Sequence, residues 1–302
     1  MNARIKLKKT PDHVVFDIVS YGLTFIFGMM CLIPFYLIFI SSFASDSALL
    51  RNGYRLIPKE FSLNSYQWVF KSPQRIFLAY RNTIFVTVTG TALSVLLSTM
   101  TGYVLARKDF PWRNGFSLFY FFTTLFNGGL VPWYILCTQY LGFKNKFISM
   151  ILPMAFPVWN MIIAKNYMKG IPYEIIESAK VDGANDILIF FRLILPVATP
   201  LIATLGLFSA LTYWNDWYNC MLFVTDKNKQ NLQYFLQEML GSIEALKQLI
   251  AKGESSVLDN VTLPQAGIKM AMTCVVVGPI IFLYPMIQKY FIKGLTIGAA
   301  KG

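Results

Sequence analysis

Residues 177–183 read Glu-Ser-Ala-Lys-Val-Asp-Gly and carry side chains suited to binding another protein. Carboxylates such as those of Glu177 and Asp182 form charge-assisted hydrogen bonds, which are stronger than neutral ones. The segment lies between two stretches too apolar for water, where polar sequence is costly unless it lies outside the lipid. Leu195-Pro196 follows at a fixed distance. We therefore expect a docking surface at the membrane face.

Neighbouring residues predict how this segment is held. Pro172 suits the first turn of a helix, where its missing N–H would be unsatisfied anyway. Glu174 then meets the positive end of the helix dipole. Gly183 permits a sharp change of direction that a side chain would hinder. A second short helix follows from Asn185, and Leu195-Pro196 opens an apolar span. The expected product is a helix–turn–helix along the membrane surface.

No residue pattern predicts catalysis, metal binding or a bound cofactor on this chain. The only histidine is His13, and the cysteines form no CxxC pair. The phosphate-binding pattern G-x-x-x-x-G-K-[ST] does not occur, so the chain is not expected to hydrolyse ATP itself. We expect buried, inert thiols at all four cysteines, Cys31, Cys137, Cys220 and Cys274.

The composition predicts an all-α membrane protein. Of the 302 residues, 55% are hydrophobic and only 14% are charged, whereas soluble domains carry about 25% charged residues. Several apolar blocks approach the ~20 residues that cross a bilayer core. We place six spans, with residues 1–15 and 293–302 as termini of one membrane domain, 16–292. The spans lie near residues 16–40, 83–106, 116–137, 147–167, 195–224 and 269–291.

The polar segments predict the topology. With six spans, the long loops 41–82 and 225–267 share one side of the membrane, and loop 172–194 shares the other side with both termini. Short basic segments favour the cytoplasm, and the N-terminal residues 4–9 form such a segment. The net charge of +12 is scattered over loops without a nucleic-acid-binding motif, so we expect anionic lipid and not nucleic acid as its partner.

The motif around Gly183 resembles that of the binding-protein-dependent import permeases of the ATP-binding-cassette (ABC) class. Their pattern is Glu-Ala-Ala, three residues, Gly, nine residues, Ile-x-Leu-Pro. Glu177, Ala179, Gly183 and Leu195-Pro196 match it, whereas Ser178 and Leu193 are small departures.

The whole chain resembles the carbohydrate-uptake subfamily of these permeases, including the smaller maltose permease subunit. It is more similar still to Gram-positive oligosaccharide permeases that work with lipoprotein binding proteins. Three further passages carry this resemblance, namely residues 126–132 (Phe-Asn-Gly-Gly-Leu-Val-Pro), 214–217 (Trp-Asn-Asp-Trp) and the ending 290–298.

This resemblance implies the type I importer permease fold, with six helices, cytoplasmic termini and a cytoplasmic coupling helix in a bacterial plasma membrane. It implies a heterodimer with a second permease subunit. It also implies two ATPase subunits that hold ATP and Mg, an extracellular solute-binding lipoprotein and an oligosaccharide substrate. The residues implied to dock on the ATPase are Glu177, Ser178, Ala179, Asp182 and Gly183.

Five residues are candidates for the substrate path: Asn127, Trp214, Asn215, Trp217 and Tyr218. Residues 214–218 lie about 20 residues into the fifth span, or about 30 Å along a helix. They form either an aromatic belt at the outer interface or a platform on which a sugar stacks. Around Asn127, the Asn-Gly-Gly sequence predicts either a broken helix that lines a cavity or a close-packing kink.

Two other classes of function compete with ATP-driven sugar import. An ion-coupled secondary transporter would place an ionisable residue at mid-membrane, and the expected span centres carry almost none. An intramembrane enzyme would need a catalytic constellation that the spans lack. An ABC permease for a solute other than a sugar stays open.

Overall fold

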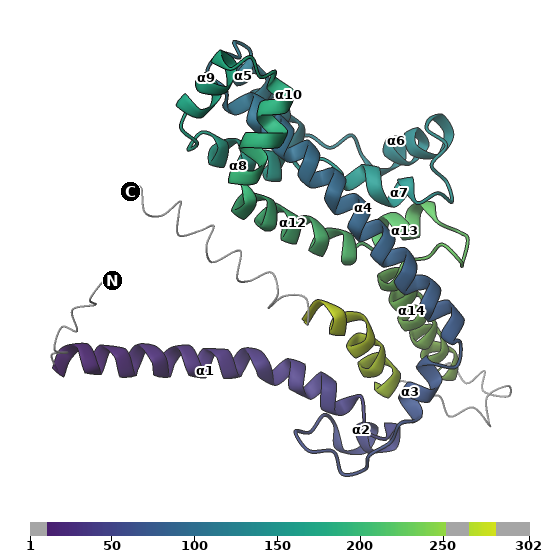
Figure 1. Ribbon diagram of the computed structural model, residues 1–302. Coiled ribbons are helices and arrows are strands. Elements are labelled where there is room, and N and C mark those ends of the chain that lie inside the picture. Colours follow the sequence, from purple (N-terminus) through teal and green to yellow (C-terminus); the bar gives the residue numbers. More distant parts are fainter. Residues whose placement is uncertain (1–10, 252–265, 282–302) are drawn as a thin grey trace. The chain divides into compact units, whose positions relative to one another are not determined.

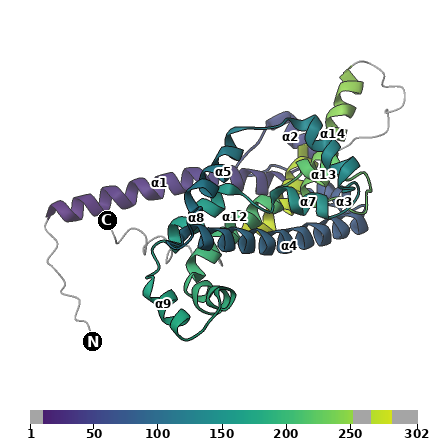
Figure 2. The ribbon, with the colours of Figure 1, turned by 90° about the horizontal axis from the view of Figure 1, so that it is seen from above.

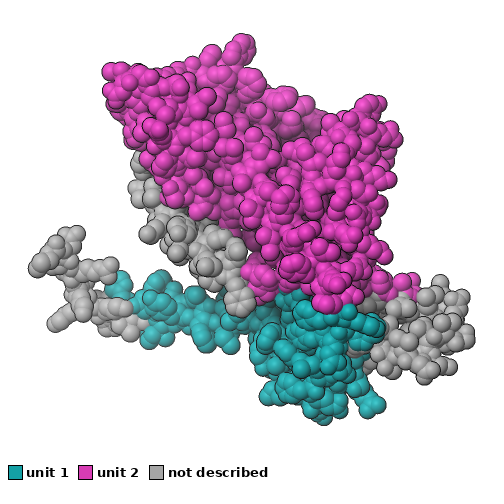
Figure 3. Space-filling view, turned by 45° about the vertical axis from the view of Figure 1, so that its right-hand side comes forward, with its two compact units in different colours: residues 1–71, 254–275 teal, residues 72–253, 276–302 magenta. Residues whose placement is uncertain are grey.

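The computed structural model describes residues 11–251 and 266–281. The chain forms two compact units (Figure 3), which are residues 1–71 with 254–275 and residues 72–253 with 276–302. Over the described ranges every regular element is helical, and the one β-bridge pairs Ala44 with Phe61. This agrees with the all-α expectation.

The first unit is built on α1 (Pro11–Ser41), followed by α2 (Asp46–Asn52) and α3 (Asn64–Val69) (Figure 1). Within α1, Val15–Ser41 is long and apolar enough to cross a membrane, and none of its most apolar window is buried by protein. In the same unit the Asp46 carboxylate accepts hydrogen bonds from the amides of Ala266 and Gly267, at 2.9 and 3.1 Å. These amides open the helix Ala266–Ile281.

The second unit is organised around α4 (Pro73–Ala106), which packs along α8 (Val158–Met168) and α12 (Thr199–Trp214) (Figures 1 and 2). Glycines on α4 allow this close approach. A Cβ atom at Gly90 would lie 2.4 Å from the Tyr213 ring, and one at Gly102 would lie 2.5 Å from the Ala164 side chain.

The remaining elements of this unit are short. Before α8 they are α5 (Arg113–Leu125), α6 (Leu130–Ile135), a π-helical turn Leu136–Tyr140, α7 (Ile148–Ile151) and a 3₁₀ turn Leu152–Met154. After it come α9 (Glu174–Val181), α10 (Asp186–Ile189), a π-helical turn Phe190–Ile194, α11 (Leu195–Val197), α13 (Tyr218–Phe223) and α14 (Leu232–Ala251).

The described helices fit some of the expected spans and correct others. The stretches Val15–Ser41 and Pro73–Ala106 are each long enough to cross a membrane, and two bent helix pairs qualify if each pair is one span. The first span is therefore confirmed as a helix. The second starts at Pro73, ten residues earlier than expected, because residues 73–82 continue the same helix. The sixth is helical to Ile281, and its remainder lies outside the described residues.

The third span is interrupted at the Asn-Gly-Gly sequence, as expected, whereas the fifth is not the continuous helix that hydropathy suggested. Residues 126–129 separate α5 from α6. The fifth bends by 84° between Asp186–Val197 and Thr199–Trp214, and its helix stops at Trp214, not at residue 224. Pro200 explains the bend, because it has no N–H to donate to the Pro196 carbonyl. The Thr199 hydroxyl donates to that carbonyl instead, at 2.6 Å.

Candidate functional site: a membrane-surface hairpin and two cavities

The α9–α10 segment (residues 174–189) forms a helical hairpin at the C-terminal end of α4 (Figure 1). Gly183 has φ +80°, a left-handed conformation that side chains disfavour. The Ala184 amide donates to the Ala179 carbonyl at 2.9 Å and closes the turn. Asn185 then caps α10 by accepting a hydrogen bond from the Leu188 amide, at 2.8 Å. The sharp turn expected at Gly183 is confirmed.

The two faces of this hairpin differ. Ile176 and Ala179 are buried, and they join a core with Tyr103 of α4, Ala164 of α8 and Ile189 of α10. Four of the five residues expected to dock on a partner are exposed, namely Glu177, Ser178, Asp182 and Gly183. The fifth, Ala179, is only 7% exposed, so its side chain packs inward.

Two exposed apolar residues on the hairpin were missed by the sequence reasoning. Val181 is 88% exposed and Ile187 is 70% exposed, on either side of Gly183. Exposed apolar side chains beside polar ones are typical of contact surfaces. For Val181 the signal was present in the sequence, since it is an apolar residue between Lys180 and Asp182.

An ionic cluster fastens the hairpin to the end of α4. Arg107, the residue after α4, forms ion pairs with Asp109 and with Asp186 of α10. Lys180 of α9 reaches the same Asp109 carboxylate at 3.0 Å. The Arg107 side chain is only 10% exposed. Ion pairs therefore tie both α9 and α10 to residues 107–109 at the end of α4.

The cluster shifts the acidity of its members in the direction that keeps all of them charged. Hydrogen bonding from Arg107, followed by Lys180, lowers the pKa of Asp109 well below its ordinary value. Hydrogen bonds to Asp109 and Asp186 raise the pKa of Arg107 above its ordinary value. The hydrogen bond to Asp109 likewise raises the pKa of Lys180. Arg107, Asp109 and Lys180 therefore remain charged throughout the neutral pH range.

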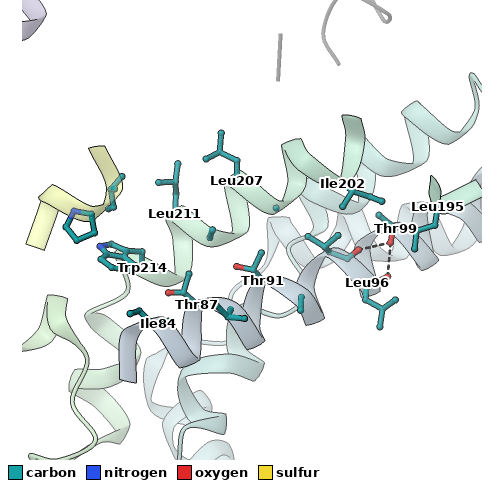
Figure 4. A pocket seen from close by; sticks show the side chains of 17 residues that line it. Ile84, Thr87, Thr91, Leu96, Thr99, Leu195, Ile202, Leu207, Leu211 and Trp214 are labelled. Carbon is teal, nitrogen blue, oxygen red and sulfur yellow. Dashed lines mark hydrogen bonds between the residues drawn. The ribbon is translucent and has the colours of Figure 1, made fainter. Parts of the chain in front are cut away.

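A first cavity of about 630 Å³ lies along α4 and α12 (Figure 4). Threonines of α4 and leucines of α12 line it. The hydroxyl groups of Thr87 and Thr91 are buried there and have no hydrogen-bond partner within the described chain. Trp214 closes one end, and its indole N–H donates to the Val276 carbonyl at 3.3 Å.

A second cavity of about 620 Å³ lies where α8 is separated from the preceding helical turn, a break that bends the chain by 49°. Phe156 and the 69% exposed Trp159 supply aromatic surface. Asn160 lines the same space and donates to the Ser209 hydroxyl at 3.1 Å. Non-helical backbone at membrane depth is tolerated where it lines a cavity. The sequence reasoning did not predict this cavity.

The five residues expected on the substrate path occupy different surroundings. Trp214 lines the first cavity. The Asn215 side chain donates to the Leu211 carbonyl at 2.9 Å and accepts from the Gln233 side chain at 3.0 Å. Trp217 and Tyr218 are partly exposed and meet edge to face, with centroids 5.9 Å apart. Asn127 accepts the Gly129 amide at 2.9 Å and so stabilises the break before α6.

The thiols also differ from expectation. Cys137 and Cys220 are buried as expected, but Cys31 is exposed and Cys274 is intermediate. Cys31 lies on α1, and none of the most apolar window of that helix is buried within the described residues. Among the described residues no three metal-ligating side chains come together.

Two helices and two bent helix pairs long and apolar enough to cross a membrane, with a polar hairpin tied to the end of α4, are the features of a polytopic membrane protein. Residues 98–218 match the family described as "Binding-protein-dependent transport system inner membrane component". A polygalacturonan/rhamnogalacturonan transport system permease of Bacillus subtilis is 36% identical over 95% of this chain and 99% of that protein. The protein LplC of the same organism is also 36% identical, over 98% of both chains.

A solved structure agrees. The chain of a bacterial ABC transporter involved in the import of the acidic polysaccharide alginate matches with a TM-score of 0.78 and 27% identity. The match covers 95% of this chain and 100% of that one. The present chain belongs to the binding-protein-dependent ABC import permeases. It is a membrane permease subunit, and permease subunits of this family are not themselves catalytic.

Proposed function

We propose that this permease moves an oligosaccharide from an extracellular binding protein into the cytoplasm, driven by ATP hydrolysis on two partner ATPase subunits. A second, homologous permease subunit completes the pathway. The observation that carries this proposal is the α9–α10 hairpin, which exposes Glu177, Ser178 and Asp182 yet is tied through Arg107 to α4. ATP and Mg belong to the partner subunits, since this chain carries no phosphate-binding motif.

Alternating access follows from how the hairpin is attached. An ATPase dimer that closes moves the docked hairpin, and the ionic cluster passes the displacement to α4. Because α8 and α12 both pack on α4, they move with it. The cavities then face outward or inward. Two such states need to differ by only a few kcal/mol for bound partners to shift their populations.

The saccharide class is supported by relatives and by cavity chemistry. The relatives above are named for polygalacturonan and rhamnogalacturonan transport and for alginate import, and a further relative is an arabinooligosaccharides permease. The cavity beside the α8 break combines aromatic rings at Phe156 and Trp159 with the polar groups of Asn160 and Thr212. Sugars present C–H faces to rings and hydroxyls to amides, so this cavity suits them. None of these relatives is named as an ion-coupled transporter.

The topology proposed is six spans with both termini in the cytoplasm of a bacterial plasma membrane. Residues 1–15 and 293–302 are then cytoplasmic, and residues 16–292 form the membrane domain. Loops 41–82 and 225–267 face the binding protein, and residues 172–194 carry the coupling hairpin. In the described part of the chain, two single helices and two bent helix pairs are long and apolar enough to cross a membrane. They support the proposed count of spans.

Docking is tested by reversing one charge on the hairpin. Glu177→Lys in the purified complex is expected to abolish ATP-driven uptake into proteoliposomes while basal ATP hydrolysis persists. The matched control is Glu174→Lys, because Glu174 is also exposed and lies one turn earlier in α9. Equal uptake by the Glu177 variant and the wild type would remove Glu177 from the docking surface.

The saccharide path is tested at Trp159. Uptake of oligogalacturonides is expected to fall about tenfold or more in Trp159→Ala, because loss of a stacking ring from a central contact costs 1 kcal/mol or more. Tyr140→Ala is the control, since Tyr140 is 80% exposed and lines neither cavity. Unchanged uptake by Trp159→Ala would assign this ring to a lipid-facing role.

A further inference from the structure

An excess of positive charge lies close to the hairpin, where α5 begins and α8 ends. Lys165 on α8 donates to the Ser117 hydroxyl of α5 at 2.6 Å. Lys169 and Arg113 lie near enough to Lys165 to repel it electrostatically. Arg113 bonds through one nitrogen to the Arg107 carbonyl at 3.3 Å, which leaves its other donors available.

This charge is not neutralised by the neighbouring ionic cluster. In that cluster two cations, Arg107 and Lys180, balance two carboxylates, Asp109 and Asp186. Arg113, Lys165 and Lys169 have no acidic partner within the described residues. Three cations crowded on two helix ends repel one another, so the site favours an anion.

A largely apolar hollow of about 270 Å³ lies between the end of α4 and the start of α5. It is lined by Met100, Thr101, Val104, Leu105, Phe110, Phe116 and Tyr120. Arg113, Phe116, Ser117 and Tyr120 recur at three- and four-residue spacing and therefore share one face of α5. The basic and apolar surfaces are thus continuous.

The depth of this surface is marked by Trp112, which is 70% exposed between α4 and α5. Exposed tryptophans beside transmembrane helices lie at the headgroup level. Phe110 and Phe116 stack just inside it, with ring centroids 5.9 Å apart. A ligand here meets cations at the headgroup level and apolar surface toward the bilayer core.

We infer that Arg113, Lys165 and Lys169 bind the phosphate of an anionic phospholipid whose acyl chain fills the hollow beside Phe116. Basic pockets between transmembrane helices on the cytoplasmic side suit such headgroups. The bound lipid offsets the repulsion between α5 and α8 beside the hairpin. This inference goes beyond the import function, because it assigns the permease a lipid on which coupling depends.

The experiment uses the whole transporter complex in nanodiscs of phosphatidylcholine alone or of phosphatidylcholine and phosphatidylglycerol in equal parts. In the wild type, a phosphatidylglycerol with a photoreactive acyl chain is expected to crosslink to the peptide that contains residues 100–120. Crosslinking to other regions only would overturn the proposal, whatever the behaviour of any variant.

The matched variants are two triple substitutions. Arg113→Gln with Lys165→Gln and Lys169→Gln is expected to lower phosphatidylglycerol retention on the order of tenfold or more, since each cation near anionic lipid contributes about 1 kcal/mol. The control, Lys144→Gln with Lys146→Gln and Lys227→Gln, removes three exposed lysines elsewhere and is expected to retain the lipid.

Two further outcomes decide between lipid and protein. A charge-conserving triple, Arg113→Lys with Lys165→Arg and Lys169→Arg, is expected to keep both the crosslink and the retention. If the glutamine triple instead retains phosphatidylglycerol but loses the ATPase subunits, the cations contact protein acids and the lipid site is wrong. The lipid site is also refuted if the glutamine triple loses only the binding of inorganic phosphate and retains phosphatidylglycerol as the wild type does.

Discussion

Gly183 is the residue at which the hairpin depends most on backbone conformation. Its φ of +80° is costly for a residue with a side chain, by about 1–2 kcal/mol. No neighbouring atom lies within 4 Å of a Cβ placed there, so the penalty is conformational and not steric. We expect Gly183→Val to distort the turn while leaving the buried contacts of Ile176 and Ala179 in place.

The predicted consequence is uncoupling. Uptake by the Gly183→Val complex should fall at least about tenfold, whereas the subunits should still co-purify and hydrolyse ATP. Gly115→Ala is the control, because Gly115 on α5 also has open space around it but no positive φ. Normal uptake by both variants would show that the turn geometry is dispensable.

Asp109 determines how the hairpin responds to acid. Its pKa is lowered in the folded protein, so its contribution to stability is fully present above the ordinary value near 3.8 and is lost only as the pH falls through the lowered value. The pKa values of Arg107 and Lys180 are raised, so neither charge is lost near neutrality. The hydrogen-exchange protection factors of residues 174–189 should therefore stay constant between about pH 5 and 9.

The substitution Asp109→Asn tests whether the ionic cluster stabilises the hairpin more than an isolated surface charge does. It leaves Arg107 and Lys180 without their shared carboxylate. Protection of residues 174–189 should fall severalfold, because one charge-assisted contact contributes about 1 kcal/mol or more. Asp182→Asn is the control, since Asp182 is exposed on the same hairpin and forms no ion pair within the described residues. A protection change in the control alone would contradict the assignment.

At the scale of the helix, α4 is the element against which the others are assembled. Gly102 lets it touch α8, and a Cβ there would lie 2.5 Å from the Ala164 side chain and 2.8 Å from the Lys165 backbone nitrogen. The backbone of α8 cannot move aside as easily as the end of a flexible side chain can. Gly102→Leu should therefore destabilise the complex by about 1–3 kcal/mol or more, measured as a lower Tm. Gly22→Leu on α1, where nothing lies within 4 Å, should leave the Tm unchanged.

Sequence reasoning predicted elements well where one local rule dominates. The turn at Gly183 and the start of a second short helix at Asn185 were predicted from residue type, and both occur. The first span follows from hydropathy. Hydropathy does not register where a helix breaks, because Pro200 and residues 126–129 leave the apolar run intact while removing or redirecting backbone hydrogen bonds.

The cavities were harder to predict because they are made by residues distant in the chain. Trp159 and Thr212 meet only because α8 and α12 both pack on α4. The sequence grouped Trp214, Asn215 and Trp217 because they are adjacent. A helix ends at Trp214, however, so the three side chains leave the backbone toward different neighbours. Adjacency in sequence predicts a shared site only within one regular element.

For the whole molecule, orientation in the membrane decides whether the hairpin can meet an ATPase at all. The proposal places the α9–α10 hairpin in the cytoplasm and the loop between the third and fourth spans outside. Asp182 and Lys144 are both exposed and lie on these two segments. A single cysteine at either position therefore reports its side, provided that Cys31 and the other native cysteines are first replaced by serine.

A membrane-impermeant maleimide added to intact cells should label Lys144→Cys and leave Asp182→Cys unlabelled. Permeabilising the cells should make both reactive, which shows that Asp182→Cys is accessible and not merely buried. The difference has a physical basis, because a charged reagent cannot cross the hydrocarbon core that the spans traverse. Labelling of Asp182→Cys in intact cells would place the hairpin outside, where no ATP-hydrolysing partner could reach it, and would refute the coupling role along with the topology.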